Sequence, residues 1–201
     1  MTCIVGLRAP DGVVMGGDSA GIGNMDLHVR ADEKVFARSG GGADWLFGFT
    51  SSFRMGQLIR YSLKLPKVPG RDGDLYRYMV TKFVDACRDC FKSGGFAQKH
   101  KEEESAGTFL VGVRGSLFTV YGDYQVAQEA CGFASVGCGG EIARGSLHAT
   151  AVAAREAQPW RIGPRRRVEM ALQAAEQCSA EVRGPFVILE GARRKKMRGR
   201  R

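Results

Sequence analysis

The sequence contains no apolar run long enough to cross a membrane. A transmembrane helix needs about 20 consecutive apolar residues, and the first apolar stretch is already interrupted by Arg8, Pro10 and Asp11. No basic segment precedes that stretch, although a secretory signal requires one. These absences predict a cytoplasmic protein that is not held in a membrane.

Histidine is scarce, and cysteine lacks the spacing of a metal site. His28, His100 and His148 lie far apart in the sequence, which argues against a histidine-based catalytic triad and a histidine metal site. Cys87 and Cys90 form a CxxC pair, but zinc would need a second pair at comparable spacing. In a chain without a signal peptide the thiols should stay reduced. We therefore expect no metal and no cofactor.

No change in composition divides the chain, so we expect one domain over residues 1–191 and a basic tail over 192–201. The formal net charge is +9, and much of it lies in the tail and in the run Arg165–Arg167. Tails of this kind are usually solvated ends, which argues against nucleic acid as a partner. The alternative left open is an arm that binds nucleic acid or an acidic partner.

Hydrophobic periodicity and turn residues divide the chain into strands and helices. Residues 23–32 and 94–105 are predicted to be loops. Cys87 and Cys90 share the apolar stripe of one helix, which favours a place in the core for both. Strands are expected at 3–8, 13–17, 33–37, 45–49, 108–113, 117–121, 125–130, 133–136 and 186–189, and helices at 51–64, 73–93, 140–155 and 168–178.

The order of these elements is strands, two helices, strands, two helices and one strand, which is neither a βαβ alternation nor an all-β pattern. It predicts an α+β fold, a four-layer αββα sandwich of two antiparallel sheets flanked by helix pairs. The continuous apolar run at 109–113 supports strands that are covered on both faces, as the middle of such a sandwich requires.

Thr2 follows the initiator Met1 and would become the N-terminus if Met1 were removed. A terminal threonine carries its own base, because its α-amine has an ordinary pKa of about 7.7 to 8.0 and lies a few bonds from the hydroxyl. The competing interpretation is an ordinary first strand, since β-branched residues suit strands. The N-terminal segment alone does not decide between the two.

Thr2, Asp18 and Lys34 fall at the offsets at which the β-type proteasome subunits carry their nucleophilic threonine, an aspartate at a strand end and their catalytic lysine. The chain therefore resembles this family, and most closely the HslV-like peptidases among the N-terminal nucleophile hydrolases. The resemblance covers nearly the whole chain. It implies that Thr2 is the nucleophile, that Lys34 lowers the pKa of its hydroxyl, and that Asp18 holds Lys34 charged. The resemblance also implies that the backbone N–H of Gly48 binds the oxyanion that forms from the substrate carbonyl, although Phe49 stands where the family often has a second glycine.

Further site residues follow from the same resemblance, with departures. Cys138 stands where the family has a serine that assists the terminal amine, and a thiol is the poorer hydrogen-bond partner. Glu176 and Ser179 resemble the family's Asp-x-x-Ser, which would place them around the amine. The alternative for this pair is an exposed acid at a helix end and a capping serine.

The resemblance also implies a substrate cleft lined by Gly21, Ile22, Asp32 and Phe36. An Asp32 in this cleft would favour basic or polar residues ahead of the cleaved bond. The family forms homo-oligomeric stacked rings around a chamber, takes polypeptide substrates, and is often fed by an ATPase that unfolds them.

The resulting hypothesis is a self-compartmentalising threonine endopeptidase, conditional on removal of Met1. Two alternatives remain at this point. One is an N-terminal nucleophile amidohydrolase that acts on a small amide. The other is a catalytically silent ring or scaffold protein whose basic tail binds nucleic acid or acidic partners, and a retained Met1 would favour it.

Overall fold

The computed structural model describes residues 2–23, 26–70, 73–100, 103–156 and 162–192. Within these residues no helix is both long and apolar enough to cross a membrane. Of the predicted basic tail, 192–201, only Ala192 is among the described residues.

Two antiparallel sheets form the centre of the molecule. The four-stranded sheet has the order β12-β1-β2-β13, and the five-stranded sheet has the order β11-β10-β9-β6-β5. The first comprises β1 (Ile4–Ala9), β2 (Gly12–Gly17), β12 (Phe133–Val136) and β13 (Val187–Ala192). The second comprises β5 (Val35–Gly40), β6 (Ala43–Phe49), β9 (Phe109–Val113), β10 (Ser116–Val120) and β11 (Val126–Ala127).

Polar side chains cap the first two helical segments. Ser52 caps α1 (Phe53–Gln57), which continues into a wider π-helical turn, η1 (Leu58–Ser62). Asp74 caps α2 (Leu75–Tyr78), which runs through η2 (Met79–Phe83) into α3 (Val84–Ser93). The later helices are α4 (Gly140–Glu156) and α5 (Pro164–Cys178). All agree with the predicted helices to within a few residues.

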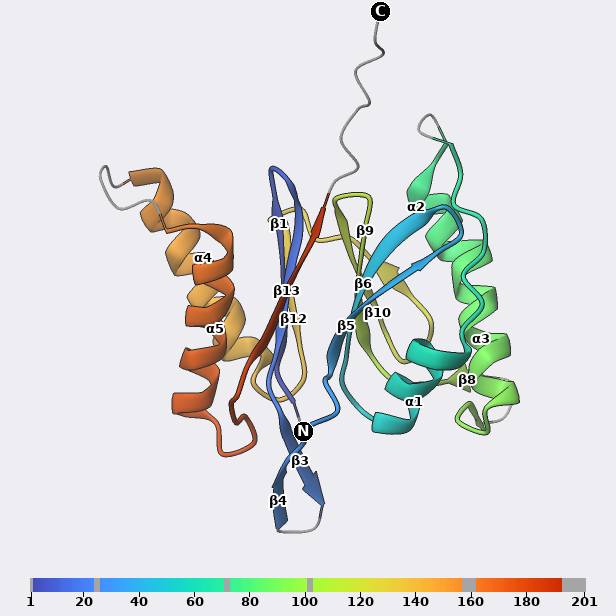
Figure 1. Cartoon of the computed structure of the whole chain (residues 1–201), viewed down its shortest axis with the longest axis horizontal. Coiled ribbons are helices and arrows are strands. Elements are labelled where there is room, and N and C mark those ends of the chain that lie inside the picture. Colours follow the sequence, from blue (N-terminus) through green and yellow to red (C-terminus); the bar gives the residue numbers. More distant parts are fainter. Residues whose placement is uncertain (1, 24–25, 71–72, 101–102, 157–161, 193–201) are drawn as a thin grey trace, which may run out of the picture.

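The helices lie on the outer faces of the two sheets (Figure 1). Helices α4 and α5 cover the four-stranded sheet around Leu147 and Leu172, and α1 to α3 cover the five-stranded sheet around Phe83 and Phe91. A third cluster, which includes Met15 and Leu110, fills the space between the sheets. The structure is thus a mixed α and β fold with antiparallel sheets, in agreement with the predicted class.

The β1–β2 hairpin sets the position of the N-terminus. Its register pairs Ile4 with Gly17, and the Asp18 N–H donates to the Cys3 carbonyl at 3.2 Å. A side chain at Gly17 would collide with Ile4 and Val35. The glycine therefore lets the end of β2 pack closely against β1 and β5, so that Asp18 lies beside the start of the chain.

Two segments predicted to be loops contain short hairpins, so both predictions are wrong in part. Residues 23–32 overlap β3 (Ala20–Gly23) and β4 (Asp26–Val29), and residues 94–105 contain β7 (Gln98–His100) and β8 (Glu103–Ser105). All four residues of β4 are exposed. Backbone pairing holds such hairpins together, and without a buried face there is no alternation of apolar and polar residues to reveal them. The predicted strand at 125–130 is also shorter, because only β11 pairs.

The cysteines of the CxxC pair lie where the apolar stripe predicted. Cys87 is fully buried in the cluster beneath α3, and Cys90 packs against the same cluster. Burial raises the pKa of the Cys87 thiol well above its ordinary value. Both residues are therefore part of the helical core.

We predict that Gly48→Ala lowers the free energy of unfolding by about 1 to 3 kcal/mol. A Cβ at this position would lie 2.5 Å from Ile4 Cγ2 and 2.9 Å from Met15 Sδ, inside the core between the sheets. Urea unfolding followed by circular dichroism measures the change. Gly145→Ala, at an exposed position of helix α4, is the control. A Cβ on Gly145 would have no atom within 4 Å, so this variant should be neutral or stabilising. Equal stability of both variants would contradict the packing argument.

Candidate active site

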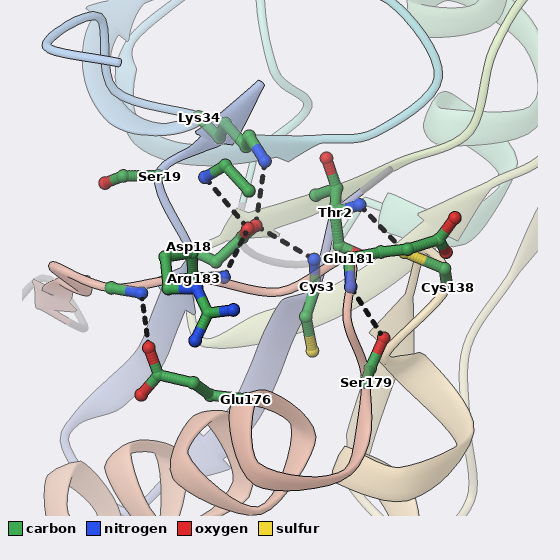
Figure 2. A network of polar contacts seen from close by, with 12 residues as sticks. Thr2, Cys3, Asp18, Ser19, Lys34, Cys138, Glu176, Ser179, Glu181 and Arg183 are labelled. Carbon is green, nitrogen blue, oxygen red and sulfur yellow. Dashed lines mark hydrogen bonds and ion pairs between the residues drawn. The ribbon is translucent and has the colours of Figure 1, made fainter. Parts of the chain in front are cut away.

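The Asp18 carboxylate is the centre of a buried polar network at one end of the two sheets (Figure 2). The residue follows β2 and is 1% exposed. Its Oδ1 accepts hydrogen bonds from the Cys3 amide at 2.9 Å and from Lys34 Nζ at 2.8 Å. Its Oδ2 accepts from the Ala20 amide at 3.0 Å and the Arg183 amide at 3.4 Å. Four donors from four parts of the chain thus orient one buried negative charge.

Lys34 is buried to the same degree as Asp18 and lies immediately before β5. Its ammonium group lies 2.8 Å from Asp18 Oδ1 and 5.8 Å from the centre of the Phe53 ring. Burial lowers the pKa of Lys34, and the Asp18 carboxylate opposes that change by raising it. The ion pair therefore offsets the cost of placing an ammonium group in the interior.

Thr2 lies at the start of β1 and is 3% exposed. Its N–H donates to Cys138 Sγ at 3.0 Å, and its carbonyl accepts from the Gly139 amide and the Cys138 thiol, both at 3.3 Å. In Figure 2 the Thr2 side chain lies between Lys34 and Cys138. Thr2, Asp18 and Lys34, the three residues predicted from their offsets, are therefore brought together.

Gly137 makes room for this arrangement. It has a φ of +94°, and a Cβ on this residue would lie only 2.1 Å from the Thr2 carbonyl oxygen. An L-residue is strained at such a φ. The glycine is needed both for the turn that enters α4 and for the approach of that turn to Thr2.

The two cysteines near Thr2 have different surroundings. Cys3 is fully buried just before β1, and burial, together with the Asp18 charge, raises the pKa of its thiol to about 12. Burial also raises the pKa of Cys138, as does a hydrogen bond with the Glu181 carboxylate, whereas the Thr2 N–H lowers it. Both residues are therefore thiols at neutral pH, and Cys138 is the one that contacts the Thr2 nitrogen.

Glu176 and Ser179 organise the turn that follows α5. Glu176 Oε1 accepts from the Gly184 amide at 2.8 Å, and Ser179 Oγ accepts from the Glu181 amide at 3.3 Å. The same turn contributes the Arg183 amide to Asp18. Both predicted residues thus lie in the site region, where the observed role of their side chains is to hold backbone amides of this turn.

The position of Gly48 argues against the oxyanion role predicted for it. Gly48 pairs with Leu110 in β6–β9, and the Thr50 amide donates to the Thr108 carbonyl at 3.1 Å two residues further along the same register. Since alternate pairs of an antiparallel ladder exchange hydrogen bonds, the Gly48 amide also points into the ladder. It is committed to the sheet and cannot bind a substrate oxygen.

Ser51 lies just beyond the end of β6, so its amide is not part of the ladder that occupies the Gly48 amide. Its φ is +70°, which is unusual for a residue with a side chain. The hydrogen bonds found within the described residues do not engage its N–H. Ser51 and Thr50 line a cavity of about 440 Å³ together with Gly137, the residue that contacts the Thr2 carbonyl.

The four residues predicted to line a substrate cleft are not all accessible. Gly21 and Ile22 lie in the β3–β4 hairpin, and a Cβ on Gly21 would meet Arg30 Cδ at 2.6 Å. Phe36 is 2% exposed and belongs to the core beneath the helices. Gly21 is also buried, so Ile22 and Asp32 are the two of the four that reach the surface.

Asp32 is not a free negative charge. Its two carboxylate oxygens each accept a hydrogen bond from the Arg30 guanidinium at 2.7 Å, and this pairing lowers the pKa of Asp32. The Arg30 guanidinium also lies over the Phe53 ring, 3.8 Å from its centre. The surface next to Lys34 thus presents a paired arginine on an aromatic ring.

Sequence reasoning missed Glu181, Ser51, Arg30 and the Arg183 amide. Glu181 has no motif context, and its neighbours in space come from β1 and the turn before α4. Arg183 contributes its backbone, which any residue could supply. Among these, the pair Arg30 and Asp32 had a signal in the sequence, because residues at i and i+2 place both side chains on the same side of an extended chain.

No known protein family and no curated protein matches the sequence. Solved structures do match in fold. BPH of Thiobacillus denitrificans in complex with epoxomicin has a TM-score of 0.70 at 16% identity, over 94% of this chain and 99% of that one. HslV from Trypanosoma brucei has a TM-score of 0.60 at 15% identity, over 93% and 97%. The Anbu complex from Pseudomonas aeruginosa, a helical assembly, has a TM-score of 0.63 at 16% identity, over 96% and 81%.

These likenesses cover almost the whole chain, but their sequence identities are low. They therefore establish the fold rather than an activity. The chain has the fold of BPH, HslV and Anbu.

Proposed function

We propose that this protein is a threonine endopeptidase of the N-terminal nucleophile type, which becomes active when Met1 is removed. The observation that carries the proposal is the buried Asp18–Lys34 ion pair beside Thr2, with Nζ and Oδ1 2.8 Å apart. A buried ion pair costs desolvation energy, so its place next to a potential nucleophile favours a chemical role. We further propose the four-layer αββα arrangement of this enzyme class.

The reaction begins at the Thr2 hydroxyl. The freed α-amine takes the hydroxyl proton, directly or through a water, and the oxygen attacks a peptide carbonyl. The resulting tetrahedral intermediate collapses to an ester on Thr2, and the amine leaving group departs with the proton. Water then hydrolyses the ester and releases the acid. The Lys34 ammonium stabilises the Thr2 alkoxide as it forms, and Asp18 keeps that ammonium charged and in place.

The Ser51 amide is the better candidate for the oxyanion donor. An oxyanion donor must be preorganised and must not already bond to the protein. The Gly48 amide fails the second condition, whereas Ser51 lies next to Gly137 at the cavity wall. The positive φ of Ser51 turns the chain at this point, in agreement with a backbone held for a ligand.

The fold likeness supports the remaining parts of the proposal. HslV and the Anbu complex share the fold, and the Anbu structure is a helical assembly. We propose homo-oligomeric rings with polypeptide substrates, fed by an ATPase that unfolds them, in the cytoplasm. A catalytically silent ring protein is the outcome if Met1 is retained.

Removing the nucleophile tests the proposal directly. We predict that Thr2→Ala lowers peptide hydrolysis by at least about 1000-fold, because the hydroxyl that forms the ester is absent. Mass spectrometry of the wild-type N-terminus should show that Met1 is missing. Thr81→Ala, on an exposed helical turn, is the matched control and should keep full activity. Unchanged hydrolysis in Thr2→Ala, or an intact Met1 in active protein, would refute the mechanism.

The ion pair gives a second prediction, on stability. Asp18→Asn leaves the buried Lys34 ammonium without its counter-charge and should lower the free energy of unfolding by about 3 to 5 kcal/mol. The double variant Asp18→Asn/Lys34→Met should lose less than the sum of the two single variants. Denaturant titration of all three measures the coupling. Asp85→Asn, in an exposed pair with Arg88, should cost less than about 0.5 kcal/mol. Additive losses at Asp18 and Lys34 would contradict the pairing.

Cleavage specificity gives a third prediction. Because Arg30 already neutralises Asp32, the wild-type enzyme should show little preference for basic residues ahead of the cleaved bond. Arg30→Ala frees the carboxylate and should raise cleavage after lysine or arginine about fivefold. A peptide library read by mass spectrometry compares the two enzymes, with Arg88→Ala as control for loss of an exposed arginine. An unchanged profile would exclude Asp32 from the substrate site.

A further inference from the structure

Cys138 links the Thr2 nitrogen to a carboxylate that the proposed mechanism does not use. Its Sγ accepts the Thr2 N–H at 3.0 Å, and the Glu181 carboxylate lies beside it and raises the pKa of the thiol. Figure 2 shows the Glu181 carboxylate beside Cys138, on the side of Thr2 away from Lys34. The contacts therefore run from the nitrogen through the sulfur to the carboxylate.

The turn after α5 holds Glu181 in this place. The Ser179 hydroxyl accepts the Glu181 amide at 3.3 Å, and the Glu176 carboxylate accepts the Gly184 amide at 2.8 Å. Val182, the next residue, is fully buried against the α4–α5 cluster. The backbone on both sides of Glu181 is thus fixed, and its side chain is directed at the turn that carries Cys138.

The charged and titratable groups around the Thr2 nitrogen come from five parts of the chain. Lys34 and Asp18 lie on one side, Cys138 and Glu181 on the other, and the Cys3 thiol just before β1 stays protonated. Lys34 and Asp18 neutralise each other. Glu181 is therefore the carboxylate left to act on a positive charge at the Thr2 amine.

We propose that Glu181 is a positioning residue that tunes the Thr2 α-amine through the Cys138 thiol. This inference rests on the proposed function of Thr2. When the amine takes the hydroxyl proton it becomes an ammonium group, and one of its N–H bonds points at Cys138 Sγ. In this step the thiol proton, which the structure directs at the Thr2 carbonyl, turns to the Glu181 carboxylate, which leaves the sulfur richer in electrons and a better acceptor. No proton leaves this chain of hydrogen bonds, and no further reactant is needed.

The effect has a defined sign. A carboxylate favours the charged form of a nearby amine, so Glu181 raises the pKa of the Thr2 ammonium. Only the neutral amine acts as a base, and activity on the acid side therefore follows this pKa. Removing the charge should move the acid limb of the pH profile to lower pH.

The experiment compares wild-type protein with Glu181→Gln, each with Met1 removed. We expect the acid limb of kcat/KM to shift down by about 0.5 to 1 pH unit and kcat at the optimum to fall about tenfold. Glu181→Asp should restore part of both. Glu169→Gln, an exposed acid on α5, should leave the profile unchanged. Thermal unfolding of each variant verifies that it is folded.

A double-variant comparison tests whether the thiol transmits the effect. In a Cys138→Ala background, Glu181→Gln should shift the acid limb by less than half as much as in the wild type. An equal shift in both backgrounds would overturn the role of Cys138, and an unshifted profile of Glu181→Gln in the wild-type background would overturn the role of Glu181.

A second readout does not depend on catalysis. The rate at which an amine-reactive ester labels the Thr2 nitrogen, followed by mass spectrometry over a range of pH, reports the pKa of the amine itself. Glu181→Gln should lower this pKa by the same amount as the acid limb. If labelling shifts while wild-type protein cleaves no peptide, the inference on Glu181 holds and the proposed peptidase function fails. If peptides are cleaved and labelling does not shift, the inference on Glu181 fails alone.

Discussion

The ion pair between Asp18 and Lys34 is the interaction on which the site depends. Both groups are almost completely buried, so each requires the other to offset its loss of hydration. The carboxylate also accepts backbone amides from β1, from the start of β3 and from the turn after α5. One charge thus holds four segments of the chain around Thr2, and the geometry around Thr2 and the stability of this end of the molecule are coupled.

Glycines and turns bring the other groups into place. Gly17 lets β2 end beside β1, and Gly137 lets the turn before α4 approach the Thr2 carbonyl. The turn after α5 contributes through its backbone and through Glu181. A similar fold with different side chains around the amine is therefore possible, since several of these contacts depend on the path of the backbone. In this chain the side chain beside the Thr2 nitrogen is a thiol, that of Cys138.

Most of the large elements could be predicted because they bury one continuous apolar face. The helix that ends at Ser93 and the strand Phe109–Val113 show this in their spacing. The β3–β4 hairpin could not be predicted, because its second strand is exposed and lacks an apolar face. The bidentate pairing of Asp32 with Arg30 was not predicted, since it depends on the conformation of the loop before β5.

The sequence by itself determined the α+β class, because hydrophobic periodicity carries that information, and it indicated the trio Thr2, Asp18 and Lys34 through the family that their offsets resemble. Only the tertiary structure decided which backbone amides remain available. Gly48 and Ser51 are three residues apart, yet the ladder with β9 occupies one amide and the turn after β6 leaves the other exposed to the cavity. Hydrogen-bond partners of this kind come from strands and turns distant in the chain, so no local pattern specifies them. The same holds for Glu181, whose neighbour Cys138 comes from the turn before α4.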